Sequence, residues 1–261
     1  LTINFVMAEV IPLFKSHYSL GRSILTLEKS GDTQENYPDS IIDIAKNNNL
    51  KKFYLIDDNM SGFLQAYVNS KDAGLDLVFG LRLGICPDMH QKDDESRGET
   101  CKYIILAKNS EGYKRLVKIY TKAAKEGFYY YPRIDFKTLN QLWSEEDLQM
   151  AIPFYDSFIF NNVMGSAFCI PDFSEIKPVF FMEDNDLPFD DLVKARVEQY
   201  CEDKYEIVNT KSVYYKDKKD FKAFVTFKCI NNRSVLDKPQ FDHMCSDEFC
   251  FESWKEKNGS V

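Results

Sequence analysis

Carboxylates that could work as a pair occur at two places in the sequence. Asp57 and Asp58 are adjacent at the end of a strand-like stretch, and Glu183, Asp184 and Asp186 form a second acidic group. Two neighbouring carboxylates can serve as general acid and general base in hydrolysis. Adjacent residues of a strand point to opposite faces, however, so Asp57 and Asp58 form no dyad if the strand includes both. We therefore expect no acid–base catalysis at either group.

Imidazole and thiol groups are scattered along the chain. His17, His90 and His243 are far apart in the sequence and lack the spacing of metal ligands. Cys245 and Cys250 lie near His243, but a zinc site there needs ligands that the sequence does not show. The seven cysteines include no CxxC pair, which is typical of reduced thiols. The sequence also contains no GxGxxG or Walker-type loop, so we expect no cofactor.

Charge and composition narrow the class of protein. The net charge is −8 over 261 residues, the pI is about 5.1 and the mean hydropathy is −0.39. Surfaces that bind duplex DNA usually carry a basic excess, so we expect no direct binding of nucleic acid. No apolar run approaches the roughly 20 residues that span a bilayer, and the first residues do not resemble a signal peptide. We expect a single cytoplasmic domain over residues 1–261.

Strand-like and helix-like segments alternate along the chain. The strand-like segments are 10–14, 51–58, 75–85, 102–108, 150–160, 178–183 and 205–215. Helical spacing of apolar residues appears in 40–48, 63–74 and 110–127. We expect Ser110 to cap the longest helix and Gly74 and Gly127 to end theirs. This alternation favours an α/β fold built from parallel βα units, either a barrel or a doubly wound sheet.

One face of the helix expected at 110–127 carries cations. They are Lys114, Lys118, Lys122 and Lys125. Further aromatic and basic side chains follow, namely Tyr129, Tyr130, Tyr131, Arg133 and Lys137. This surface could bind a nucleic-acid backbone or an acidic protein. It could also be the solvated face of a helix whose apolar face holds Leu116, Val117, Tyr120 and Ala124, and we favour this second interpretation.

The segment KYIILAKNSEGYKRLVKIYTKAAKEGFYYYPRIDFKTL, residues 102–139, resembles the PHP domain at the N-terminus of bacterial DNA polymerase III alpha subunits. Shorter similarities occur in the same order at HYSLGRS, at YLIDDNMSG with the AYVNSKDAGLDLVFGLRL that follows, and from NTKSVYYKDKKDF onward. Residues 156–190 match poorly. The resemblance implies a distorted βα barrel of about seven strands.

The resemblance also implies a site that this sequence has lost. Family members that hydrolyse phosphoesters hold two or three metal ions with imidazoles and carboxylates at the ends of barrel strands. Those ligand positions are occupied here by Leu13, Lys15, Arg22, Asp58, Arg82, Lys102, Tyr155, Ser212 and Tyr214. Only Asp58 could coordinate a metal, so we expect a pseudo-phosphoesterase without a metal. We expect the cations Arg22, Arg82 and Lys102 to form ion pairs with the adjacent aspartates at the end of segment 51–58.

Function is then expected on the surface of the domain. In the family this domain braces the polymerase, and in some members it contacts the proofreading exonuclease. We expect a catalytically inactive PHP-like module that binds a protein partner in DNA replication or repair. Because residues 156–190 depart most from the family, we place a candidate interface at Phe158, Phe160 and Phe173, although core phenylalanines are the simpler interpretation.

Two alternatives stay open. The chain could be a divergent metal-dependent phosphoesterase or exonuclease with a relocated site. It could also be the N-terminal fragment of a polymerase alpha subunit, because the similarity stops where the polymerase palm would begin. The abundance of Lys, Asn, Phe and Tyr is compatible with an AT-rich phage genome.

Overall fold

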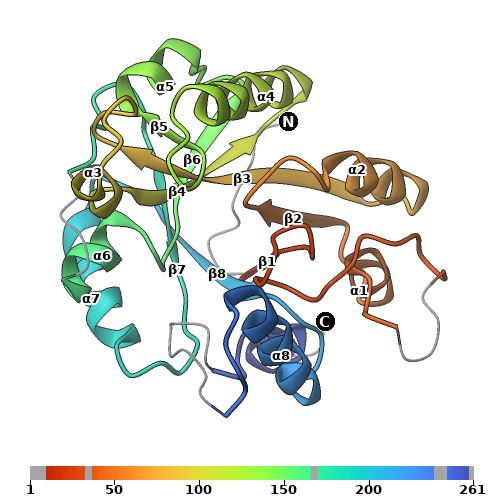
Figure 1. The fold of residues 1–261 in the computed structure, drawn as a ribbon. Helices are drawn as coiled ribbons and strands as arrows, with labels where there is room; N and C mark the ends of the chain where they lie inside the picture. The colour runs from red at the N-terminus through yellow and green to blue at the C-terminus, as the bar shows by residue number, and fades with distance from the viewer. Residues whose placement is uncertain (1–9, 33–36, 166–169, 238–245, 259–261) are drawn as a thin grey trace. The chain divides into compact units, whose positions relative to one another are not determined.

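The computed structural model describes residues 10–32, 37–165, 170–237 and 246–258 (Figure 1). The strands are β1 (Ile11–Phe14), β2 (Lys52–Asp57), β3 (Asp76–Cys86), β4 (Cys101–Ala107), β5 (Arg133–Asp135), β6 (Leu148–Ile152), β7 (Val179–Met182) and β8 (Ile207–Val213). The helices are α1 (Ile41–Asn47), α2 (Phe63–Asp72), α3 (Asp94–Gly98), α4 (Ser110–Lys125), α5 (Phe136–Leu142), α6 (Phe158–Met164), α7 (Asp190–Cys201), η1 (Lys218–Asp220), α8 (Phe221–Asn232) and α9 (Phe251–Asn258). None of these helices is both long and apolar enough to cross a bilayer.

The described strands form one sheet in the order β2-β1-β8-β7-β6-β4-β3-β5, and β2 also pairs with β3. This additional pairing closes seven strands into a barrel and leaves β5 beside β3. The prediction of a distorted βα barrel of about seven strands is confirmed. The expectation of uniformly parallel strands is wrong at β4, which is antiparallel to both β3 and β6. The segment between β3 and β4 contains one short helix, the five-residue α3. After it, β4 runs beside β3 in the opposite direction.

The chain divides into two compact units, which we describe separately. The first unit holds the described residues of 80–183 and 188–208, and the second holds those of 10–79, 184–187 and 209–258. Both β3 and β8 contribute residues to each unit, so the division does not follow the order of the chain. That residues 1–261 form a single domain stays a prediction.

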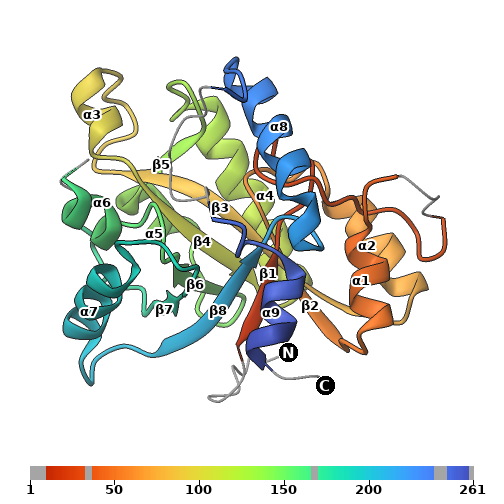
Figure 2. The same ribbon diagram turned by 90° about the horizontal axis from the view of Figure 1, so that it is seen from below.

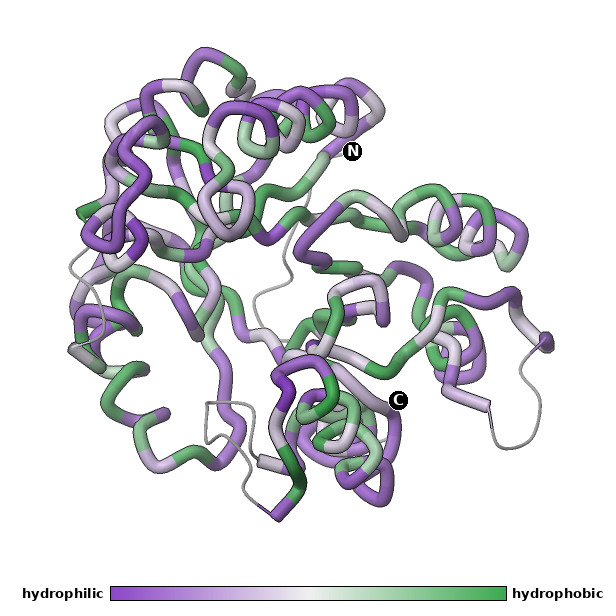
Figure 3. Tube along the Cα trace, viewed as in Figure 1, coloured by the Kyte–Doolittle hydropathy of each residue, from purple (hydrophilic) through white to green (hydrophobic). Residues whose placement is uncertain are grey.

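In the first unit, α4 packs against β4, β5 and α5. The helix is capped by Asn109, whose side chain accepts a hydrogen bond of 2.8 Å from the backbone N–H of Gly112, and not by Ser110 as predicted. Its buried side chains include Leu116, Ile119 and Ala123, and α4 alternates between hydrophobic and hydrophilic residues in Figure 3. Val117, predicted to lie on the apolar face, is 40% exposed. The buried stripe is therefore rotated by one residue from the prediction.

The long motif of residues 102–139 is explained by packing. A Cβ atom on Gly112 would lie 2.2 Å from the carbonyl oxygen of Asp147, and one on Gly127 would lie 1.9 Å from that of Arg133. Only glycine permits such close approach of backbone. Arg133 is fully buried and donates hydrogen bonds to the carbonyl oxygens of Gly127 and Gln91. Arg133 is thus a structural residue of the first unit, and its burial argues against a place on the docking surface that we considered for this stretch.

Aromatic rings fill the part of the first unit around α6. The predicted strand through residue 160 is wrong, because β6 ends at Ile152 and α6 begins at Phe158. Phe158 and Phe160 are buried. The ring of Phe158 contacts those of Phe173, Phe180 and Tyr200 at centroid distances of 5.9, 6.4 and 5.1 Å. Phe173 is half-buried in the same cluster. The burial of Phe158 and Phe160 argues against the candidate interface and favours the simpler interpretation of core phenylalanines.

In the second unit, β1 lies between β2 and β8 and is parallel to both. Helix α9 packs beside β1 (Figure 2). The ring of Phe251 stacks on Phe14 at 5.8 Å, and the indole N–H of Trp254 donates to the carbonyl oxygen of Val10 at 2.7 Å. These contacts fix α9 to the strand whose end carries the first candidate site residues.

Candidate functional site

The second unit brings two of the former ligand positions together. Lys15 follows the last residue of β1, and Asp58 follows the last residue of β2. The two strands are parallel neighbours, so their carboxyl ends lie side by side. The ammonium of Lys15 is 3.0 Å from Oδ1 of Asp58, and the two side chains are 6% and 27% exposed. The single carboxylate among the former ligand positions is therefore engaged by a lysine that occupies another of them.

Asp57 has a different set of partners. Its buried carboxylate accepts hydrogen bonds from the backbone N–H of Ser16 at 2.9 Å and from the hydroxyls of Ser16 and Ser19 at 2.6 and 2.8 Å. Burial raises the pKa of Asp57, while Lys15 and the serine hydrogen bonds oppose that rise. The arrangement ties the loop after β1 to the end of β2. It gives Asp57 a structural role and no access to a substrate.

The first unit holds an ion pair at one further former ligand position, Arg82. Arg82 on β3 pairs with Asp156, which follows β6, and the two side chains are 10% and 26% exposed. Asp156 is a partner that the sequence did not suggest, because we expected the adjacent aspartates of the second unit. The ammonium of Lys102 lies 4.5 Å from the ring centre of Tyr131, a cation–π contact. Asp156 and Tyr131 are thus contacts beyond those we expected, and the pairing of these cations with Asp57 or Asp58 stays a prediction.

The remaining former ligand positions carry aliphatic, hydroxyl and guanidinium groups in place of imidazoles and carboxylates. Leu13 and Ser212 are buried in their strands. The ring of Tyr214 stacks on Phe224 and Phe249 at 5.9 and 5.3 Å. The hydroxyl of Tyr155 donates to a carboxylate oxygen of Asp190 at 3.0 Å, and Arg22 is half-buried.

The residues at these positions do not fit a metal centre. Ammonium and guanidinium groups offer no lone pair, and a lone carboxylate paired with a lysine does not make a coordination sphere. Within the part of the chain that the structure describes, no three His, Cys, Asp or Glu side chains are grouped so that they could bind a metal. His243 and Cys245, which we considered as zinc ligands, lie outside the described residues.

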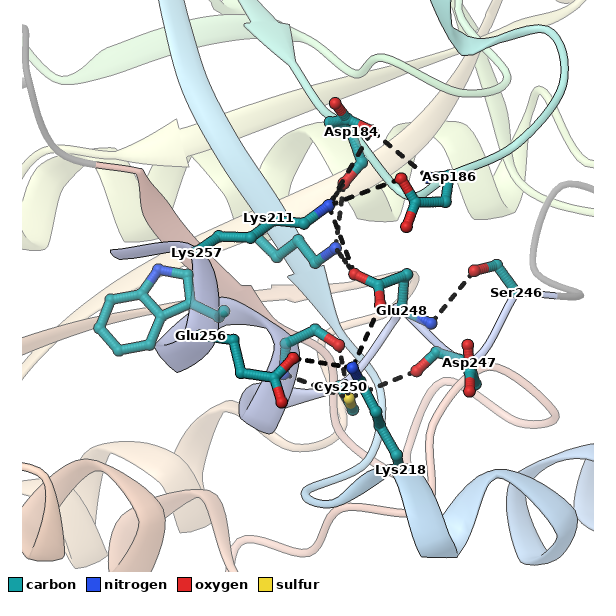
Figure 4. Close-up of polar contacts among 12 residues, drawn as sticks. Asp184, Asp186, Lys211, Lys218, Ser246, Asp247, Glu248, Cys250, Glu256 and Lys257 are labelled. Atoms are coloured by element: carbon teal, nitrogen blue, oxygen red, sulfur yellow. Dashed lines mark hydrogen bonds and ion pairs between the residues drawn. The ribbon is translucent and has the colours of Figure 1, made fainter. Parts of the chain in front are cut away.

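A charged cluster of the second unit escaped the sequence analysis (Figure 4). Lys211 on β8 is buried, and its ammonium lies 3.2 Å from Oε2 of Glu248. Lys218 and Lys257 approach the same carboxylate at 3.5 and 3.3 Å. Burial would raise the pKa of Glu248, but Lys211 and Lys257 outweigh it and hold the pKa below its ordinary value. One feature of the sequence could have indicated this cluster, namely the position of the charged residue Lys211 inside a strand-like segment.

This cluster joins three segments of the second unit. Lys211 also donates to the carbonyl oxygen of Asp184 at 3.0 Å, and Lys257 of α9 lies 4.0 Å from the carboxylates of both Asp184 and Asp186. Asp184 and Asp186, two members of the acidic group considered for catalysis, are thus in contact with lysines. The contacts of the cluster connect β8 and α9 to the segments that contain Asp184 and Glu248.

Two of the buried thiols, Cys201 and Cys250, are poor nucleophiles. Burial raises the pKa of Cys201 to about 12 and also raises that of Cys250. A thiolate is the reactive form of cysteine, so these two side chains are inert at neutral pH.

The lysines of α4 lie at the surface of the first unit. Lys114 and Lys122 form ion pairs of 2.6 Å with Glu111 and Glu126 on the same helix. Lys118 and Lys125 are exposed. The structure therefore agrees with a solvated face for part of this stripe and leaves Lys118 and Lys125 accessible to a ligand.

Comparison with known proteins gives the family. A family model for the PHP domain matches residues 26–157, just over half of the chain. The DNA polymerase III alpha subunit of Helicobacter pylori is 35% identical over 85 residues, which is 32% of this chain and 7% of that protein. The subunit of Borreliella burgdorferi is 36% identical over 98 residues, 36% of this chain and 8% of that protein. That of Chlamydia trachomatis is 29% identical over 147 residues, 48% of this chain and 12% of that protein.

The matched stretch is thus a small part of each of these relatives. The match covers β4, α4 and the glycine-dependent packing that follows them. The chain belongs to the PHP domain family.

Proposed function

We propose that this chain is a catalytically inactive PHP module of the cytoplasm that acts by binding a protein partner in DNA replication or repair. The observation that carries the proposal is the ion pair between Lys15 and Asp58. A catalytic site of the metal-dependent kind needs neutral or anionic ligands that surround a cation. A lysine in that place supplies the positive charge itself, without the open coordination position that binds a substrate.

The replication context comes from the relatives, which are named as DNA polymerase III alpha subunits. A protein partner is preferred to nucleic acid because the chain carries a net charge of −8. Such a charge disfavours binding to a phosphate backbone by the chain as a whole.

The proposal is tested by hydrolysis and by capture. The purified chain is incubated with Mn²⁺, Zn²⁺ or Mg²⁺ and assayed for phosphatase and 3′–5′ exonuclease activity beside its Asp58→Asn variant. We expect neither protein to hydrolyse substrate, and we expect the immobilised chain to retain a purified replication protein such as a proofreading exonuclease. Metal-dependent hydrolysis by the chain would overturn the proposal, and persistence of that activity in the variant would indicate a relocated metal centre.

A further inference from the structure

Helices α4 and α5 of the first unit pack against each other (Figure 1). Residues of both helices line a groove. Its volume is about 420 Å³. The lining residues from α4 and its end are Val117, Lys118, Thr121, Lys122, Lys125 and Glu126. Those from α5 are Thr138, Gln141 and Leu142. Both walls are regular helices, so the groove is held by well-defined backbone.

Two of the lining residues, Val117 and Leu142, are aliphatic, and we refer to them as the floor of the groove. Val117 is 40% exposed on a helix whose buried stripe includes Leu116 and Ile119. Leu142 ends α5 and is half-buried on the opposite wall. A partner side chain seated between these two residues would remove apolar surface from water, which contributes about 25 cal/mol for each Å² buried. The floor therefore favours a ligand with an aliphatic or aromatic side chain.

The rim of the groove is basic, in contrast to the chain as a whole. Lys118, Lys122 and Lys125 all line it, and Glu126 is paired with Lys122. Among the described residues, no carboxylate lies within ion-pair distance of Lys118 or Lys125. This local excess of lysines contrasts with the net charge of −8 of the chain. Charge complementarity therefore points to an acidic ligand.

We propose that the groove between α4 and α5 binds an acidic amphipathic segment of a partner protein. The apolar side chains of that segment would sit on Val117 and Leu142, and its carboxylates would meet the rim lysines. Amphipathic helices bind apolar grooves in this way, with anchors one turn apart. A single-stranded nucleic acid would satisfy the lysines but would leave the aliphatic floor without a matching group. The inference rests on the proposed function and names the class of partner.

The test uses the full chain and a fluorescein-labelled probe peptide with Leu at positions i, i+3 and i+4 and Glu elsewhere. Fluorescence anisotropy gives its affinity for the chain and for the variants Val117→Asp and Lys118→Glu. The matched controls are Val68→Asp and Lys71→Glu on α2, where Val68 is 41% exposed. We expect each groove variant to weaken binding by about tenfold, or about 1.4 kcal/mol, and each control to leave it unchanged.

Thermal unfolding followed by circular dichroism verifies that the variants fold. Unchanged binding in Val117→Asp and Lys118→Glu would overturn the proposal, as would absence of binding by the probe. A labelled oligonucleotide that binds in place of the peptide would assign the groove to nucleic acid and also overturn it. Each of these failures would leave the inactive-module proposal standing, because that proposal fails only if the chain hydrolyses phosphoesters or captures no replication protein.

Discussion

The ammonium of Lys15 lies 3.0 Å from a carboxylate oxygen of Asp58, at the adjoining ends of the parallel strands β1 and β2. In a metal centre the bound ion is the largest local charge, and the protein's carboxylates offset it. Here a side-chain cation stands beside the carboxylate. The charge of Asp58 is compensated by a side chain of the same chain, and this ion pair joins the ends of the two strands.

Replacing Lys15 with Met should destabilise the second unit by about 1–3 kcal/mol, because it leaves the partly buried carboxylate of Asp58 without this partner. The cost is below that of a fully buried pair because Asp58 is 27% exposed. Urea unfolding measures the change. The double variant with Asp58→Asn should recover most of the loss. Lys29→Met is the control, since Lys29 and Asp72 pair at 58% and 59% exposure and should contribute less than about 1 kcal/mol. Equal effects of the two lysine variants would contradict the prediction.

The pair of Lys211 and Glu248 should make stability depend on pH. The folded chain holds the pKa of Glu248 below its ordinary value of 4.5, so the stabilisation is complete above that pH and is lost as the pH falls through the folded pKa. Glu248→Gln should therefore cost about 3 kcal/mol near neutral pH and progressively less below about pH 4. Urea unfolding over this range tests the sign. A difference between the two proteins that grows as the pH falls would refute it.

Gly112→Ala should be costly because the new methyl group meets the carbonyl oxygen of Asp147, which lies 2.2 Å from the ideal Cβ position. Overpacking against backbone costs about 1–3 kcal/mol or more, and we expect a lower melting temperature. Gly98→Ala is the matched control, since nothing lies within 4 Å of its Cβ position. A variant at Gly112 that melts with the unchanged chain would contradict the packing explanation of the motif.

Phe158→Ser should destabilise the first unit by about 3–5 kcal/mol, because it removes a buried ring from the aromatic cluster around α6. Phe128→Ser, at a ring that is 51% exposed, should change stability by less than about 1 kcal/mol. Thermal unfolding of both variants provides the comparison. Reduced partner capture by Phe158→Ser at an unchanged melting temperature would restore the interface that the structure argues against.

The helix α4 could be predicted because its signals are local, whereas the barrel followed from the family resemblance, since strand–helix alternation alone also suits a doubly wound sheet. Helical spacing of apolar residues and the long motif at 102–139 identify α4 and the strand before it. Gly127 meets the backbone of Arg133 within the same motif, whereas Gly112 meets Asp147, which lies beyond the motif's end. The motif is recognised from its continuous run of residues and not from these contacts.

The segment 150–160 could not be assigned from its apolar run, since a run of this length suits a buried strand and a buried helix equally. The structure breaks it at Pro153 and at Asp156, whose φ is +61°, and Ser157 then caps α6. Proline and the capping serine were the signals that could have divided it. The partners in the ion pairs were harder still to predict. Asp156 lies 74 residues from Arg82, and Glu248 lies 37 residues from Lys211. Neither separation has a sequence period that could reveal the pair.

The most direct test of the account is the metal content of the purified chain together with its activity. The chain is dialysed with Mn²⁺, Zn²⁺ and Fe²⁺ in turn, analysed by inductively coupled plasma mass spectrometry, and assayed for hydrolysis of phosphoesters. We expect less than stoichiometric metal in the purified chain and no hydrolysis above the buffer rate. Stoichiometric metal with hydrolysis that is lost in Asp58→Asn would contradict the account, because Asp58 would then be a working ligand and not the ion-pair partner of Lys15.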